Sequence, residues 1–126
     1  MAKIGFIGLG AMGLCMARNL LTNGHEVIGF DFSKVAMDAH VKNGGDIATS
    51  AAKASAEANF AIAMLPNGDA VKQAVFGPSG VAESLPQDSL FVDMSTIHPL
   101  ETDQIRQDLR AKNISMVDAP VGRTSV

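Results

Sequence analysis

Three glycines near the start of the chain stand at a spacing that can hold a diphosphate group. Gly8, Gly10 and Gly13 form the pattern G-x-G-x-x-G directly after the apolar run 3–7. In such a pattern the first glycine permits a tight turn, the second lets the backbone approach a diphosphate, and the third lets the following helix pack closely on the strand. The N-terminus of that helix supplies free N–H groups and partial positive charge.

An acidic residue further along extends this pattern to a dinucleotide. Asp31 follows a second apolar run, 25–30, and lies 18 residues after Gly13, where a carboxylate accepts hydrogen bonds from the hydroxyls of the adenosine ribose. The carboxylate would repel a 2′-phosphate, so it favours NAD, although Ser33 and Lys34 leave some tolerance of NADP. The alternative is a glycine-rich turn in an α/β protein that binds no nucleotide.

The elements that must position these residues alternate along the chain. Apolar runs predict strands at 3–7, 25–30, 46–48, 59–65, 90–94 and 114–118. Helical spacing and capping residues predict helices at 14–21, 33–42, 50–58, 69–76 and 99–112, with a further turn at 81–85. Such alternation is typical of parallel strands joined by right-handed crossovers. We therefore expect a single α/β domain over residues 1–126, a doubly wound parallel sheet of the Rossmann type.

Ligands of such sheets bind beyond the carboxyl ends of the strands, near the point where the strand order reverses. Four strand exits in this chain carry glycine or polar groups, at 8–13, 31, 65–67 and 95–96, and we expect them to converge. The segment after the last strand leaves at the same edge and contains Arg123, whose guanidinium can bind an anion through two parallel hydrogen bonds. A surface or domain contact is the alternative role for Arg123.

Several polar residues near these exits also have structural interpretations. Ser95 and Thr96 can act as helix caps, and Thr96 is placed to cap the next predicted helix. His98 is expected to form hydrogen bonds or lie at the surface rather than act as a base, because a helix N-terminus disfavours its charged form. Asp93 and Asp118 end strands and are interpreted as structural.

Composition argues against several classes of protein. The net charge is −3 and no basic cluster occurs, so nucleic acid is not an expected partner. No run reaches the ~18 apolar residues of a membrane span, and the glycines that interrupt the apolar start argue against a cleaved signal, so we expect a cytoplasmic protein. Cys15 is expected to be buried on the first helix. His25 and His40 lack partners at ligand spacing, so no metal is expected.

Four stretches of the chain together resemble the beta-hydroxyacid dehydrogenases, a family that includes 3-hydroxyisobutyrate dehydrogenase and tartronate semialdehyde reductase. The stretches are 5–13, 64–66, 92–96 and 117–121, in the family's order and at family-like spacing. The resemblance implies hydride transfer between NAD and a small 3-hydroxy acid or its semialdehyde. It implies cofactor contacts at Gly8, Gly10, Ala11, Met12, Gly13, Asp31, Leu65, Pro66, Asn67 and Thr96. It implies substrate contacts at Ser95, Gly122, Arg123 and Thr124.

The last motif indicates one branch of this family. The family usually continues it as Ser-Gly-Gly, whereas here it continues as Gly122–Ser125, and this departure together with Thr96–Leu100 resembles the sulfolactaldehyde reductases, which use NADH. A sulfonate is a permanent anion with three acceptor oxygens, and Arg123 offers a planar fork of donors. The same fork fits a carboxylate, so 3-hydroxyisobutyrate and tartronate semialdehyde are alternative substrates. A decarboxylating relative such as 6-phosphogluconate dehydrogenase needs more cationic contacts than Arg123 alone provides.

The resemblance also implies features outside these residues. The family's catalytic lysine, a general acid toward the substrate oxygen, belongs to a second, helical domain beyond the last motif. We therefore expect no catalytic residue up to Val126, weak NAD binding without turnover by this chain alone, and a homo-oligomer for the full-length protein. A module that senses NAD without catalysis is the alternative from another class.

Overall fold

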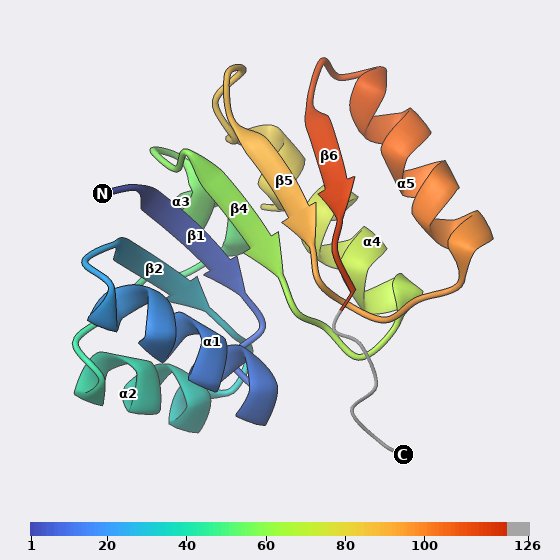
Figure 1. Ribbon diagram of the computed structural model, residues 1–126. Helices are drawn as coiled ribbons and strands as arrows, with labels where there is room; N and C mark the ends of the chain where they lie inside the picture. The colour runs from blue at the N-terminus through green and yellow to red at the C-terminus, as the bar shows by residue number, and fades with distance from the viewer. Residues whose placement is uncertain (121–126) are drawn as a thin grey trace.

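The computed structural model describes residues 1–120, which contain one six-stranded sheet (Figure 1). The strands are β1 Lys3–Ile7, β2 Glu26–Phe30, β3 Asp46–Ile47, β4 Phe60–Ala63, β5 Leu90–Asp93 and β6 Ser115–Asp118. Every neighbouring pair is parallel, and the order across the sheet is β3-β2-β1-β4-β5-β6. This is the order of the Rossmann fold, in which the direction of winding reverses between β1 and β4, and it confirms the predicted fold class.

Five α-helices connect these strands within the described residues. They are α1 Ala11–Thr22, α2 Lys34–Lys42, α3 Ala51–Ser55, α4 Gly68–Phe76 and α5 Pro99–Arg110, with a 3-10 turn, η1, at Val81–Glu83. In Figure 1, α1 and α2 lie in front of the β1 and β2 side of the sheet, α3 and α4 lie behind it, and α5 runs beside β6. Both faces of the sheet therefore carry helices, as doubly wound packing requires.

Alternating side chains of the strands enter two buried clusters, one on each face of the sheet. The cluster behind the sheet includes Phe91 of β5 and Ile105 and Leu109 of α5, which are fully buried. The cluster under α1 includes Phe6 and Val27. Burial of each such side chain contributes roughly 1.5–3 kcal/mol. The two clusters fix the strands whose carboxyl ends carry the predicted site.

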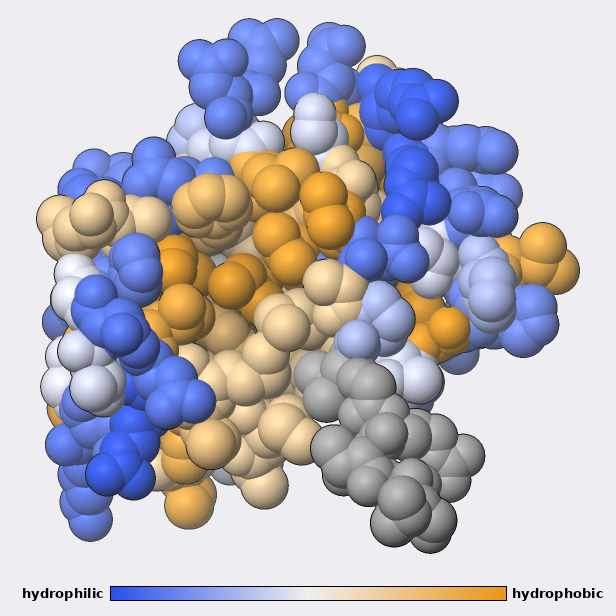
Figure 2. Space-filling model, in the orientation of Figure 1, coloured by the Kyte–Doolittle hydropathy of each residue, from blue (hydrophilic) through white to orange (hydrophobic). Residues whose placement is uncertain are grey.

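One part of the sheet has no helix over it among the described residues. On the face that α1 and α2 cover at β1 and β2, the strands β4, β5 and β6 are open to the viewer in Figure 1, and Figure 2 shows apolar surface over β4 and β5. Phe60 and Val117 are 38% and 45% exposed on this face. Met64, Val92 and Met94 are partly buried there. We call this region the open sheet face.

The first helix differs from expectation at its cysteine. α1 packs on the sheet through Gly13 and Ala17, four residues apart on one side of the helix. Cys15 lies between them in sequence and therefore on the opposite side, where it is exposed. The expectation that Cys15 is buried is wrong, because the small residues take the inner face.

In the second helix a histidine is buried, whereas the valines are exposed. His40 is fully buried, whereas Val35 on the same helix is 79% exposed. The imidazole fits because Gly45 has no side chain: a Cβ there would lie 2.1 Å from Nε2 of His40. That nitrogen donates to the carbonyl oxygen of Val27 at 3.1 Å, so the ring links α2 to β2.

Candidate nucleotide-binding site

The glycine-rich turn between β1 and α1 needs its three glycines for different reasons. Gly8 has φ +103°, and a Cβ there would lie 2.2 Å from the carbonyl oxygen of Met64. A Cβ at Gly13 would lie 2.0 Å from the carbonyl oxygen of Gly8. A Cβ at Gly10 would meet no atom within 4 Å. The fold therefore requires the first and third glycines, whereas the second leaves open space in which a ligand can approach the backbone.

The N-terminus of α1 differs from the other α-helix N-termini of residues 1–120. Its N-cap is Gly10, which has no side chain to accept a backbone N–H, and its first turn, which begins with the exposed Ala11 and Met12, has no acidic residue. The other α-helices have side-chain caps, which are Ser33, Ser50, Asn67 and His98. The first N–H groups of α1 therefore keep their partial positive charge for another acceptor. An anionic diphosphate meets that requirement.

Asp31 connects the end of β2 to the glycine-rich turn. Its Oδ2 accepts the N–H of Leu9 at 2.7 Å, and its Oδ1 accepts the N–H of Ser33 at 2.8 Å. The residue is half-buried and lines a cleft, and each carboxylate oxygen keeps a further lone pair. Asp31 therefore fixes the turn and offers acceptors to the cleft, which is the chemistry that ribose hydroxyls require.

The cleft has a volume of about 470 Å³ and lies beyond the carboxyl ends of β1, β2 and β4. Its lining includes Gly8, Asp31, Leu65 and Pro66, so three of the four predicted strand exits meet here. The lining also includes Phe32, whose side chain is 89% exposed and packs edge to face on Phe30 with ring centroids 5.3 Å apart. Flat apolar rings suit a nucleobase. Phe32 was not predicted as a site residue, although its position directly after Asp31, the proposed ribose-binding acid, is a signal that could have indicated it.

The fourth predicted exit, which follows β5, is connected to this cleft through the neighbouring exit of β4. Ser95 is 3% exposed, and its Oγ accepts the N–H of Leu65 at 2.8 Å. Thr96 is exposed and is not part of the cleft lining. Asn67 caps α4, since its Oδ1 accepts the N–H of Ala70 at 2.8 Å. Cofactor contacts by Thr96 and Asn67 and a substrate contact by Ser95 stay predictions.

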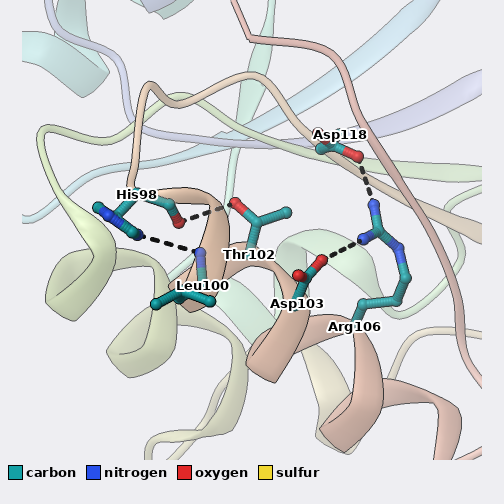
Figure 3. A network of polar contacts seen from close by, with 6 residues as sticks. All are labelled: His98, Leu100, Thr102, Asp103, Arg106 and Asp118. Atoms are coloured by element: carbon teal, nitrogen blue, oxygen red, sulfur yellow. Dashed lines mark hydrogen bonds and ion pairs between the residues drawn. The ribbon is translucent and has the colours of Figure 1, made fainter.

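The cap of α5 is a different residue from the one expected. Nδ1 of His98 accepts the N–H of Leu100 at 3.1 Å, as Figure 3 shows. The expectation that Thr96 caps this helix is wrong, because the helix begins at Pro99 and its cap is the residue directly before it. His98 therefore forms a structural hydrogen bond, which is one of the two roles expected for it.

Asp93 and Asp118, at the ends of neighbouring strands, both contact other parts of the fold. Asp118 pairs with Arg106 of α5, which also donates to Asp103 at 3.3 Å (Figure 3). Asp93 is 1% exposed, and its Oδ1 accepts the N–H of Ser95 at 2.9 Å. Burial raises the pKa of the Asp93 carboxyl above its ordinary value, although hydrogen bonding from Ser95 opposes the rise.

The predicted substrate residues Gly122, Arg123 and Thr124 lie outside the described residues. The chain leads toward them from β6, where the N–H of Ala119 donates to the carbonyl oxygen of Asp93 at 2.8 Å. Within residues 1–120, no group of His, Cys, Asp and Glu side chains could hold a metal ion. No helix in that same stretch has the length and apolar character needed to cross a membrane.

Asp31 offers acceptors to the cleft at the reversal point of the sheet, and Gly8 of the glycine-rich turn lines it. The open space at Gly10 and the free N–H groups at the start of α1 follow in the same turn, next to the residues that line the cleft. This arrangement is typical of a domain that binds NAD. Comparison with known families agrees with this class. Residues 3–125 match the family described as the NAD-binding domain of 6-phosphogluconate dehydrogenase, and the chain belongs to that family.

Individual relatives are hydroxyacid dehydrogenases and aldehyde reductases. The chain is 52% identical over 125 residues to 3-sulfolactaldehyde reductase of Escherichia coli (strain K12). The aligned region covers 99% of this chain and 42% of that protein. It is 39% identical over 119 residues to 2-(hydroxymethyl)glutarate dehydrogenase of Eubacterium barkeri, and this aligned region covers 94% of this chain and 40% of that protein. The solved structure of Mycobacterium tuberculosis 3-hydroxyisobutyrate dehydrogenase with L-serine matches with a TM-score of 0.92 and 34% identity, over 98% of this chain and 41% of that one.

These similarities confirm the resemblance to the beta-hydroxyacid dehydrogenases, and in particular to sulfolactaldehyde reductase. The chain spans about two fifths of the length of the relatives that it matches. The part that it matches is their nucleotide-binding part, since the family match covers residues 3–125.

Proposed function

We propose that this chain is the nucleotide-binding part of an NAD-dependent enzyme that transfers hydride between nicotinamide and a small 3-hydroxy acid or its semialdehyde. The observation that carries the proposal is the open space at Gly10, beside the uncapped N-terminus of α1. No neighbour within 4 Å requires a glycine at this position, whereas the close approach of a diphosphate does. When bound, NAD supplies the hydride chemistry at its nicotinamide.

The residues of this chain bind and orient the cofactor. The N–H groups of Ala11 and Met12, at the start of α1, hold the diphosphate, and Asp31 accepts hydrogen bonds from the adenosine ribose. The turn formed by Leu65 and Pro66 lies against the nucleotide. Because a 2′-phosphate would meet the like charge of Asp31, the site prefers NAD to NADP. Asn67, at the same exit as Leu65 and Pro66, and Thr96, at the fourth exit, extend these contacts, as the family resemblance implies.

For the substrate we propose a sulfonated aldehyde, 3-sulfolactaldehyde. Support comes from the 52% identity to the Escherichia coli reductase and from the run Gly122–Thr124, which replaces the small residues usual in the wider family. The fork of Arg123 offers parallel donors to a sulfonate, and Ser95 is the second proposed contact. Aldehydes and hydroxy acids that carry a carboxylate, such as 3-hydroxyisobutyrate and tartronate semialdehyde, are the alternatives because the same fork fits them.

The remaining chemistry lies with the whole protein. On reduction, the substrate oxygen takes up a proton, which we propose comes from a lysine outside residues 1–126, as the family resemblance implies. A homo-oligomer in the cytoplasm is part of the same proposal. The open sheet face supports assembly, since exposed apolar surface of this kind marks contacts with other chains or domains.

Calorimetric titration of the 126-residue chain with NADH and, separately, with NADPH tests the nucleotide site. We expect NADH to bind more tightly than NADPH. Asp31→Asn should reduce this difference in affinity, because the amide keeps one acceptor and loses the charge that repels a 2′-phosphate. Tighter binding of NADPH than NADH would refute the cofactor assignment. In the same preparation, steady-state reduction of any semialdehyde would refute the proposal that the proton donor lies elsewhere.

A further inference from the structure

Two hydrogen bonds connect a buried acid with the turn that borders the cleft. Asp93, at the end of β5, is 1% exposed, and its Oδ1 accepts the N–H of Ser95 at 2.9 Å. Oγ of Ser95, itself 3% exposed, accepts the N–H of Leu65 at 2.8 Å, across 30 residues of sequence. The last backbone bond between the two strands runs from the N–H of Met94 to the carbonyl oxygen of Ala63 at 2.9 Å, and beyond it a side chain connects the exit of β5 to the exit of β4.

This connection lies at the point where β4 leaves the sheet. Met64 still follows the ladder, because its N–H donates to the carbonyl oxygen of Ile7 at 2.9 Å. The next residue, Leu65, donates to the hydroxyl of Ser95 instead of to a strand carbonyl. Since a partly buried N–H without an acceptor destabilises the folded chain, this hydroxyl decides whether the turn can hold its position.

Leu65 in turn packs on the glycine-rich turn. A Cβ at Gly8 would lie 3.0 Å from Cδ2 of Leu65, so the side chain occupies the space that this glycine leaves. Leu65, Pro66 and Gly8 all line the cleft. A displacement of Leu65 therefore moves two walls of the cleft together.

We propose that Ser95, oriented by Asp93, is a positioning residue that holds the turn of Leu65 and Pro66 in the geometry that receives NAD. The inference rests on the proposed function, since it concerns the same cleft. This role is separate from the substrate contact proposed for Ser95, because loss of that contact alone would leave nucleotide binding unchanged. The cap of α5 is His98, so Ser95 does not have that role.

The chain offers a matched control for this hydroxyl. Ser89 lies before β5, is 8% exposed, and donates from Oγ to the carbonyl oxygen of Ala58 at 2.5 Å. Ser89→Ala and Ser95→Ala each remove a buried hydroxyl that bonds to the backbone, at opposite ends of the same strand. Only the second of these hydroxyls touches a residue of the cleft lining.

The test measures NADH affinity by calorimetry and amide hydrogen exchange at Leu65 by NMR, in the 126-residue chain. Ser95→Ala is expected to raise the Kd for NADH about five- to tenfold, as the loss of one hydrogen bond would, and to speed exchange at Leu65. Ser89→Ala is expected to change neither, although both variants lose thermal stability. Ser95→Thr, which keeps the hydroxyl, should restore both readouts, and it serves as the second variant if Ser95→Ala folds poorly.

Three results would overturn the inference. The first is equal NADH affinity of Ser95→Ala and the unsubstituted chain, whether or not exchange at Leu65 becomes faster. The second is an equal loss of affinity in Ser89→Ala, which would indicate general destabilisation. The third is failure of the unsubstituted chain to bind NADH, which refutes the proposed function itself and this inference with it. The unsubstituted chain therefore separates a failure of the function from a failure of the positioning role.

Discussion

Substitution of Gly10 by alanine separates the fold of this domain from its function. Gly10 has φ −67° and ψ −174°, which alanine adopts without strain, and an added Cβ meets no atom within 4 Å. Alanine also restricts the unfolded chain, which stabilises by about 0.4–1 kcal/mol. As an N-cap, however, alanine is worse than glycine by roughly 0.5–1 kcal/mol. The two terms oppose each other, so the free energy of unfolding should change by less than about 0.5 kcal/mol.

The same methyl group should weaken nucleotide binding strongly. The space it fills adjoins the first N–H groups of α1, where the diphosphate must approach the backbone. Overpacking a close contact typically costs about 1–3 kcal/mol, which corresponds to a rise in Kd for NADH of roughly 5- to 150-fold. A variant that folds like the unsubstituted chain should therefore lose most of its affinity.

Calorimetric titration with NADH and urea denaturation of Gly10→Ala measure the two quantities. Gly24→Asn is the matched control: Gly24 lies just past the C-terminus of α1, its Cβ position is equally open, and asparagine tolerates its φ of +87°. We expect the control to bind NADH like the unsubstituted chain. Unchanged NADH affinity in a folded Gly10→Ala variant would refute the assignment of the open space to the diphosphate.

Two further predictions concern stability. Burial raises the pKa of Asp93 above its ordinary value of 3.8, so the native state binds this proton more tightly than the unfolded chain, and stability from this group falls as pH rises from 3.8 through the raised value. Asp93→Asn cannot ionise, so its melting temperature relative to the unsubstituted chain should rise as the pH increases above 3.8, and a constant difference would contradict the sign. Gly45→Ala places a Cβ 2.1 Å from the buried imidazole of His40 and should destabilise by about 1–3 kcal/mol in urea denaturation, whereas Gly44→Asn, with an open Cβ position, should have little effect.

Local signals explain why most of the fold could be predicted from the sequence. The apolar run 3–7, the glycine spacing and Asp31 lie within one short stretch, and each follows a rule that depends on near neighbours. The alternation of strands and helices then leaves few topologies for a parallel sheet. Of the four predicted strand exits, three meet in one cleft because parallel strands all end at the same edge.

The features that the sequence did not predict depend on contacts between residues that are distant in the sequence or that compete for one position. His40 is buried because Gly45 leaves room beside it and Val27 accepts its N–H, and neither condition is a property of the helix that carries it. Cys15 is exposed because smaller residues of α1 take the inner face. The bond between Ser95 and Leu65 spans 30 residues and involves no periodic pattern, so the sequence alone does not predict it.

Because the start of α1 has no side-chain cap, bound nucleotide contributes to the stability of the folded protein. Only the folded chain presents these N–H groups together, so NAD binds the native state and not the unfolded one. A ligand at 100 times its Kd then adds about 2.7 kcal/mol to the free energy of unfolding. Copies formed in a cell with little free NAD would therefore unfold more often and be degraded sooner, and the lifetime of the protein would follow the supply of its cofactor.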